Sequence, residues 1–199
     1  MYFNIRQLDK TSTLIELDDG FFFKIKNRDW DKLDIKQDIS DEQYEFFYQE
    51  YGVKKCRFKA IDILSRSDKC EQELRRKLVE SYFHPDVIDE VIKFLKEKKY
   101  IDDANYVSNY IFYKSEKKTK AQIVTDLRRK GVASDVIEKV IYEEYCEDKE
   151  KDIVRKYLNK LVSKDDLSKE AIDKFKISLI RKGIEMRTIN EVLDELKMI

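Results

Sequence analysis

Apolar residues recur along this chain in a pattern that repeats three times. In each copy a leucine is followed ten residues later by an isoleucine, then by a valine and a further aliphatic residue. The copies begin at Leu78, Leu127 and Leu179, so they are 49 and 52 residues apart. A period of this length, filled with helix-forming residues, is typical of tandem multi-helix units that bury their apolar faces against one another.

A second apolar residue precedes each leucine by four positions, at Leu74, Ile123 and Phe175. Residues four apart lie on the same face of a helix, so each pair marks a buried stripe. The pattern therefore predicts a repeat core that contains Leu78, Ile88, Val91, Leu127, Ile137 and Val140.

Helix start and stop signals predict three helices in each copy. Pro85 suits the first turn of a helix, Ser134 and Ser168 are candidate N-caps, and Gly131 and Gly183 are candidate helix ends. The expected helices cover residues 58–66, 70–81 and 86–98, then 104–117, 120–130 and a helix capped by Ser134, then 151–162, a helix capped by Ser168, and 187–197.

The first part of the chain has a different pattern. Residues 2–8, 13–17 and 21–25 are β-prone, and Asp18-Asp19-Gly20 supplies a turn, so we expect a hairpin or three-stranded meander that docks on helices. Ser40 and Gln43 form a capping box for a helix that we expect to end at Gly52. The aromatic residues of that helix are interpreted as core, although a platform for stacking bases is the alternative: Tyr44, Phe46, Phe47, Tyr48 and Tyr51.

These patterns define one expected architecture. The protein should be mainly α-helical, with three tandem three-helix repeats that form an elongated stack, preceded by a small N-terminal β-hairpin plus helix. The expected division is residues 1–55 for the N-terminal element, then 56–103, 104–150 and 151–199 for the repeats.

Composition narrows the function classes. The 41 Lys and Arg balance 41 Asp and Glu, so any contact with nucleic acid needs a local basic patch. No apolar run is long enough to span a bilayer, and the N-terminus lacks a signal peptide, so we expect a cytoplasmic protein, and a monomer.

Candidate catalytic chemistry is sparse. The only histidine is His84, the three cysteines lack C-x-x-C spacing, and there is no Gly-rich phosphate loop. We therefore expect no catalytic residues, no cofactor and no metal site. Cys56, Cys70 and Cys146 are expected to be buried or half-buried thiols.

Basic residues gather near the C-terminal end of each middle helix. The candidate partner-binding residues are Arg75, Arg76, Lys77, Arg128, Arg129, Lys130, Arg181 and Lys182. The helix dipole favours cations at this end, which is one explanation. Recurrence in three copies favours another, a row of positive charge for an acidic filament groove or for DNA phosphates. In the leucine register the first cluster lies about one turn earlier than the other two.

Several of these segments together resemble the RecX family, over about residues 56–199. The family's pattern has an L-x-R opening, an E-L-x-x-K-L helix, a V-I-D-x-V-I helix, a Y-[IL]-D-D turn and a later E-L-[RK]-x-K-G-[IV] segment. The matching segments here are Leu64-Ser65-Arg66, Glu73-Leu74-Arg75-Arg76-Lys77-Leu78, Val87-Ile88-Asp89-Glu90-Val91-Ile92, Tyr100-Ile101-Asp102-Asp103 and Asp126-Leu127-Arg128-Arg129-Lys130-Gly131-Val132. Asp126 replaces the usual Glu, and Tyr82-Phe83 replaces a Gly-Phe pair before the third helix.

The resemblance implies a regulator of the RecA recombinase, with a role in DNA repair, recombination and the SOS response. Such a protein binds the groove of the RecA–DNA filament and limits strand exchange, ATPase and coprotease activity, without catalysis of its own. The alternative from the residues themselves is a helical DNA-binding module that contacts single- or double-stranded DNA directly through the same basic clusters.

The repeat pattern generates a test of shape. If the three repeats stack end to end, solution scattering should give a radius of gyration well above the value for a compact chain of 199 residues, about 16 Å. A value near 16 Å would contradict the elongated stack.

Overall fold

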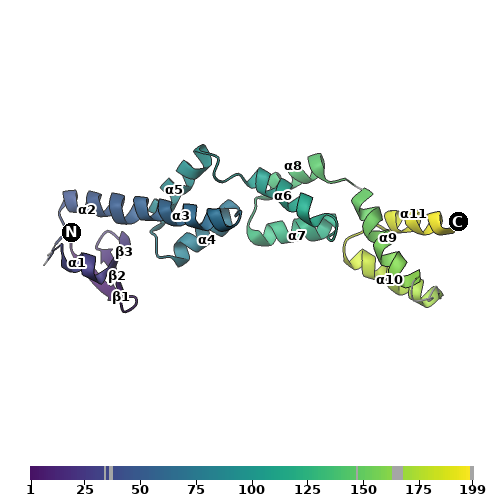
Figure 1. Cartoon of the computed structure of the whole chain (residues 1–199), viewed down its shortest axis with the longest axis horizontal. Coiled ribbons are helices and arrows are strands. Elements are labelled where there is room, and N and C mark those ends of the chain that lie inside the picture. Colours follow the sequence, from purple (N-terminus) through teal and green to yellow (C-terminus); the bar gives the residue numbers. More distant parts are fainter. Residues whose placement is uncertain (34, 36–37, 147, 163–167, 198–199) are drawn as a thin grey trace. The chain divides into compact units, whose positions relative to one another are not determined.

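The computed structural model describes every residue of the chain except 34, 36–37, 147, 163–167 and 198–199. It divides into two compact units, residues 1–102 and 103–199. Figure 1 shows helices in both units and short strands only near the N-terminus. The mainly helical fold with a small N-terminal sheet is thus confirmed, while the finer division into an N-terminal element and three repeats stays a prediction.

The N-terminal strands form an antiparallel meander in the order β1-β2-β3. The strands are β1 (Phe3–Gln7), β2 (Ser12–Leu17) and β3 (Phe22–Lys26). In the central strand, Ile15 is paired with Ile5 on one side and Phe23 on the other. Gly20 makes the tight turn before β3 with φ of +89°, which glycine adopts without steric cost.

A continuous helical run connects this sheet to the first repeat. The short helix α1 (Asn27–Asp31) follows the sheet. Farther along the chain, three elements follow one another without a break: the helix α2 (Asp41–Phe47), the π-helix η1 (Tyr48–Lys54) and the helix α3 (Lys55–Arg66). The capping box of Ser40 and Gln43 is confirmed. The prediction that the helix ends at Gly52 is wrong. Gly52 packs against Val87 instead, where an added Cβ would lie 3.0 Å from a methyl group of that side chain.

The sheet, this helical run and the first repeat share one hydrophobic core. Phe23 of β3 stacks on Phe47 of α2 with 4.6 Å between ring centroids. The same buried cluster continues through Cys56 and Leu78 to Ile101. Phe47 is buried, which confirms its interpretation as core. Phe46 is 47% exposed, so the interpretation as core is wrong for this residue.

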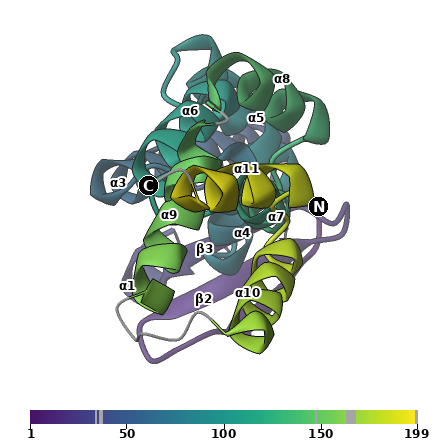
Figure 2. The same cartoon turned by 90° about the vertical axis from the view of Figure 1, so that its right-hand side faces the viewer.

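The repeat helices lie close to the expected ranges. They are α4 (Glu71–Glu80) and α5 (Pro85–Glu97), then α6 (Asp103–Lys114), α7 (Lys120–Lys130) and α8 (Ser134–Glu144), and last α9 (Asp148–Val162), α10 (Lys169–Arg181) and α11 (Met186–Lys197). The last three face the viewer in Figure 2. All six predicted core residues are buried, from Leu78 to Val140.

Two local predictions need correction. Ser134 is the first residue of α8 and Ala133 occupies the N-cap position, so Ser134 does not cap the helix with its side chain. Cys56 and Cys70 are buried as expected, but Cys146 is exposed, because it lies in the connection after α8.

All three middle helices end in the same way. Each helix end contains a residue with a positive φ. Tyr82 (65°) and Gly183 (83°) follow the C-cap, and Gly131 (95°) is itself the C-cap. The N–H of the next residue then donates to the carbonyl of the repeat leucine, for example Val132 to Leu127 at 3.1 Å. This pattern is the Schellman motif, which satisfies carbonyls that the helix end leaves free. Tyr82 therefore adopts the backbone conformation that glycine adopts in the other two repeats.

Gly183 also allows a close approach within the unit of residues 103–199. A Cβ at this position would lie 2.3 Å from the Cβ of Ala121 on α7, well inside normal contact. Beside it, the Thr119 hydroxyl donates a hydrogen bond to the Lys182 carbonyl, which joins the start of α7 to the end of α10. Absence of a side chain at Gly183 is therefore a requirement of this junction.

We expect Gly183→Ala to destabilise the protein by about 2 to 4 kcal/mol, because left-handed strain and overpacking add together. Gly20→Ala is the matched control, since Gly20 has the same handedness of φ and open space around it. That variant should lose only about 1 kcal/mol. Thermal unfolding measures both, and adding Ala121→Gly to Gly183→Ala should restore part of the loss. Equal losses for the two alanine variants would contradict the close approach.

Candidate partner-binding site

The basic cluster of the first repeat contains one arginine with intramolecular partners. Arg75 Nε lies 2.7 Å from Glu71 Oε1, and its guanidinium also binds Asp89 of α5. Lys96, also on α5, lies 2.8 Å from the other oxygen of Glu71. These ion pairs connect α4 to α5, and the Arg75 side chain is only 28% exposed. Its position indicates a structural contribution to the repeat.

The ion pairs stabilise the charged forms of both Glu71 and Arg75. Burial alone would raise the pKa of Glu71, but hydrogen bonds from Lys96 and Arg75 outweigh burial and lower it. Burial would likewise lower the pKa of Arg75, and the hydrogen bonds to Glu71 and Asp89 raise it. Glu71 therefore remains ionised to lower pH in the folded protein than in the unfolded chain.

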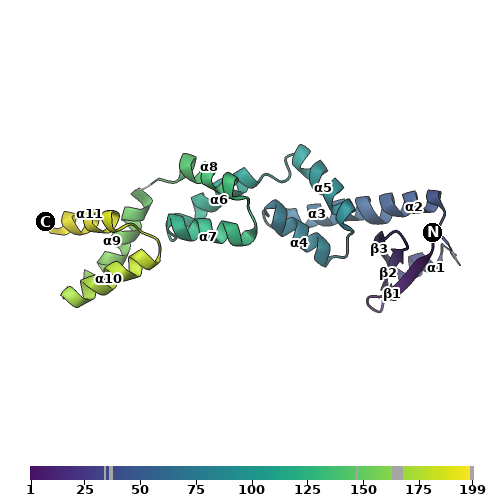
Figure 3. The ribbon, with the colours of Figure 1, turned by 180° about the vertical axis from the view of Figure 1, so that it is seen from behind.

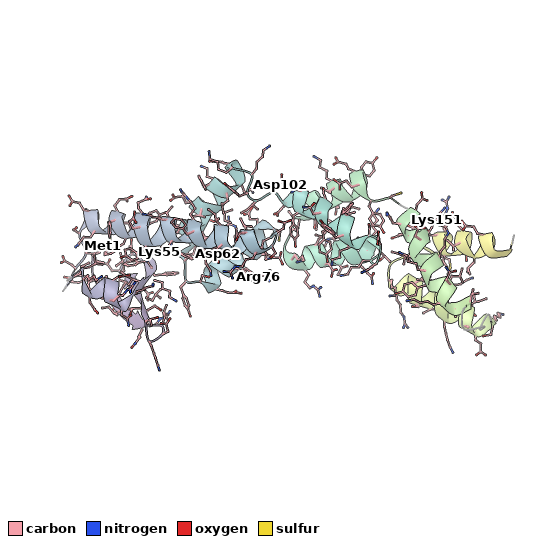
Figure 4. The ribbon with its side chains drawn as sticks, in the orientation of Figure 1. Met1, Lys55, Asp62, Arg76, Asp102 and Lys151 are labelled. Atoms are coloured by element: carbon pink, nitrogen blue, oxygen red, sulfur yellow. The ribbon has the colours of Figure 1, made fainter. Side chains whose placement is uncertain are left out.

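The other two cations of this cluster face solvent. Arg76 and Lys77 are exposed, and the structure gives neither of them an ion-pair partner among the described residues. Figure 4 labels Arg76 on α4 and Asp62 on the neighbouring α3. Lys77 lines a hollow of about 470 Å³ between α3 and α4, together with Lys59, Asp62, Ile63, Arg66, Ser67, Lys69, Glu80 and Ser81. The sequence pattern did not identify the cations that α3 and the following turn contribute.

The basic cluster of α7 is largely engaged within its own repeat. Arg128 lies 3.4 Å from Glu138 of α8, and Arg129 lies 2.9 Å from Asp126. Lys130 lies over the rings of two tyrosines of α6, with its amine 5.7 Å from the centroid of Tyr106. Arg128 and Arg129 are nevertheless exposed, and exposed ion pairs are weak enough to exchange for a partner.

The two cations at the end of α10 differ from each other. Lys182 donates a hydrogen bond of 2.7 Å to the Tyr157 hydroxyl and lies over the same ring. Arg181 is exposed and forms no ion pair within the part of the chain that the structure describes. Of the predicted residues, three are exposed and form no ion pair with a described residue: Arg76, Lys77 and Arg181.

The end of α10 borders a second basic hollow, of about 450 Å³. We call it the α7–α10 hollow, and its lining residues are Lys117, Lys118, Ala121, Gln122, Thr125, Asp126, Ile180, Arg181, Lys182 and Gly183. Lys117 and Lys118 were not among the predicted residues. In the sequence they form a pair of lysines just before the Thr119 N-cap. Other charged residues surround this pair, so the sequence alone does not distinguish it as a site.

Comparison with known proteins identifies relatives of this fold. A family model described as "RecX, first three-helix domain" matches residues 56–95. The regulatory protein RecX of Clostridium perfringens is 30% identical over 190 residues, which cover 92% of this chain and 88% of that protein. The regulatory protein RecX of Clostridium acetobutylicum is 30% identical over 176 residues, covering 82% and 75% of the two chains.

Solved structures agree with these relatives. A crystal structure of regulatory protein RecX superposes with a TM-score of 0.68 at 19% identity, covering 97% of this chain and 98% of that one. The crystal structure of RecX from Lactobacillus salivarius gives a TM-score of 0.65 at 25% identity, with coverage of 74% and 97%. Within the described residues, no helix is both long and apolar enough to cross a membrane.

The geometry at Arg75 and Arg76 predicts different effects on stability. Arg75→Ala should lower the free energy of unfolding by about 1 kcal/mol near neutral pH, because Glu71 and Asp89 lose a partner. Arg76→Ala, the matched control, should change it by less than about 0.5 kcal/mol.

The effect of Arg75→Ala should also depend on pH. Because the pKa of Glu71 is lowered from its ordinary value of 4.5, its stabilising contribution is complete above pH 4.5 and is lost as pH falls below that value. Denaturant unfolding at pH 7 and in this acid range measures the difference. The gap between wild type and Arg75→Ala should narrow in acid, and a gap that is independent of pH would contradict the ion-pair explanation.

Proposed function

The chain belongs to the RecX family, and we propose that it is a non-enzymatic regulator of the RecA recombinase. In this proposal the protein binds in the groove of the filament that RecA forms on DNA. Binding there limits strand exchange, ATP hydrolysis and the coprotease activity that triggers the SOS response. The observation that carries the proposal is the alignment with a regulatory relative over 92% of the chain, which includes residues from both units.

The surface chemistry is compatible with a partner of this kind. Arg76 and Lys77 in one unit, and Arg181 in the other, are exposed cations whose charge no described residue neutralises. An acidic partner could engage them without first breaking an intramolecular ion pair. Because each unit contributes such residues, contacts on two units would reinforce each other through effective concentration. Each contact can then be weak while the complex as a whole is stable.

The proposal that the protein performs no chemistry rests on its family, which is named for regulation. The structure adds two observations on residues of the kinds that carry chemistry. Among the residues that it describes, no group of three or more His, Cys, Asp or Glu is placed to hold a metal ion. The buried thiol of Cys56 has its pKa raised to about 12 by burial, so it is not an activated nucleophile.

A second candidate function is direct DNA binding, and one feature of α6 favours it. Phe112 and Tyr113 are strongly exposed at the end of this helix, next to the exposed Lys114. Exposed aromatic rings beside cations are typical of surfaces on which single-stranded bases stack. Binding of this kind would be strongly salt-dependent and would not require a recombinase.

Affinity for the filament distinguishes the two functions. We expect the protein to bind cognate RecA assembled on single-stranded DNA more tightly than bare single- or double-stranded DNA at the same ionic strength. The variant Arg76→Glu/Lys77→Glu/Arg181→Glu should lose at least about tenfold in affinity for the filament while its helix content is unchanged.

The matched control reverses three exposed lysines that have no ion pair among the described residues, Lys93, Lys139 and Lys174. The control should bind within about threefold of wild type, which separates a local contact from a general effect of net charge. Equal or tighter binding of the unaltered protein to bare DNA would favour the DNA-binding module instead.

A further inference from the structure

We propose that the α7–α10 hollow is the docking site for an acidic segment of a partner protein that carries an aliphatic side chain. This inference deepens the proposed function and rests on it, because the partner in question is the protein subunit of the recombinase filament. It assigns the contact to a particular hollow and to a particular kind of segment. Every residue involved lies within residues 103–199, a single compact unit.

The hollow is formed by two segments that are distant in sequence. The turn between α6 and α7 lies against the C-terminal end of α10, as Figure 3 shows, and the hydrogen bond from Thr119 to the Lys182 carbonyl holds them together. That bond also occupies a carbonyl at the negative end of α10. The close approach of Gly183 to Ala121 then brings the two sets of cations to one place.

The lining of the hollow carries an excess of positive charge. Four cations line it, Lys117, Lys118, Arg181 and Lys182, against one carboxylate. That carboxylate, Asp126, is already bound by Lys118, by Arg129 at 2.9 Å and by the Tyr110 hydroxyl at 2.9 Å.

These contacts account for all the negative charge of the lining. The hydrogen bond from Lys118 is the largest of several contacts that lower the pKa of Asp126. Asp126 therefore stays ionised, and its oxygens are already bound by residues of the same unit. Lys117 and Arg181 remain exposed, without an ion pair among the described residues. The free charge of the hollow is positive and fits carboxylates.

An aliphatic residue in the hollow favours a protein over a nucleic acid. Ile180 is 43% exposed and lies between Leu179, which is buried, and Arg181. Ala121, Thr125 and Gly183 also line the hollow and carry no charge. A phosphodiester backbone gains little from aliphatic surface, whereas a protein contact typically has an apolar centre with a charged rim. The arrangement therefore fits a Leu-, Ile- or Val-like side chain flanked by Asp or Glu.

The experiment uses the full chain and measures its affinity for cognate recombinase assembled on single-stranded DNA, and for the same DNA bare. Lys117→Glu/Arg181→Glu should weaken filament binding by at least about tenfold, with the largest loss at low salt. Ile180→Ser should weaken it by about threefold to tenfold, to the same extent at low and high salt, since the lost contact is apolar. Circular dichroism and thermal unfolding confirm that each variant is folded.

The matched control is Lys139→Glu/Lys174→Glu, which makes the same change in net charge at two exposed lysines outside the hollow. It should bind the filament within about threefold of wild type. If wild type binds the filament and Lys117→Glu/Arg181→Glu binds equally well, the proposed docking site is overturned while the proposed function stands.

Two other results are informative. An equal loss of affinity for bare DNA and for the filament, with no effect of Ile180→Ser, would overturn the protein-docking inference and assign the hollow to phosphate. Failure of the unaltered protein to bind the filament at all would overturn the proposed function, and the docking inference with it.

Discussion

Each repeat depends on the left-handed turn that follows its middle helix. At this turn the N–H of the next residue bonds to the carbonyl of the repeat leucine, and the chain reverses direction. The reversal brings the isoleucine and valine of the third helix onto the same core as that leucine. It also places the last residues of the middle helix at the surface, where the helix dipole favours cations. Packing of the core and exposure of Arg128, Arg129 and Arg181 thus have one origin.

Sequence patterns were sufficient for the parts of the fold that local rules determine. Gly131 and Gly183 could be identified as helix ends because glycine adopts positive φ without strain. Tyr82 could not, because a tyrosine takes this conformation only when surrounding contacts compensate its cost, about 1 kcal/mol. Gly52 gave the opposite error, because a glycine predicted to end a helix lies within a continuous helical run. Its small size serves close packing against Val87 instead of a helix end, and packing between helices is not visible in a local pattern.

The candidate site was only partly predictable for a related reason. Residue type and position identified the cations at the helix ends, but not which of them form ion pairs. Arg75 is held by Glu71, four residues earlier, which a helical spacing could have suggested, and by Asp89, which only the packing of α4 on α5 brings close. The proximity of Lys117 and Arg181 depends on a junction between segments more than 60 residues apart, so no local signal indicates it.

The shared core of the first unit has a consequence for the order of events during synthesis. Among the described residues, its buried cluster is made from residues between Ile15 and Ile101, which all lie within the first unit. These residues leave the ribosome before those of the second unit, at about 5 to 20 residues per second. The N-terminal sheet and first repeat can therefore fold while the second half is still being translated. A nascent chain that paused after the first unit could already have buried this core, which would protect it from aggregation.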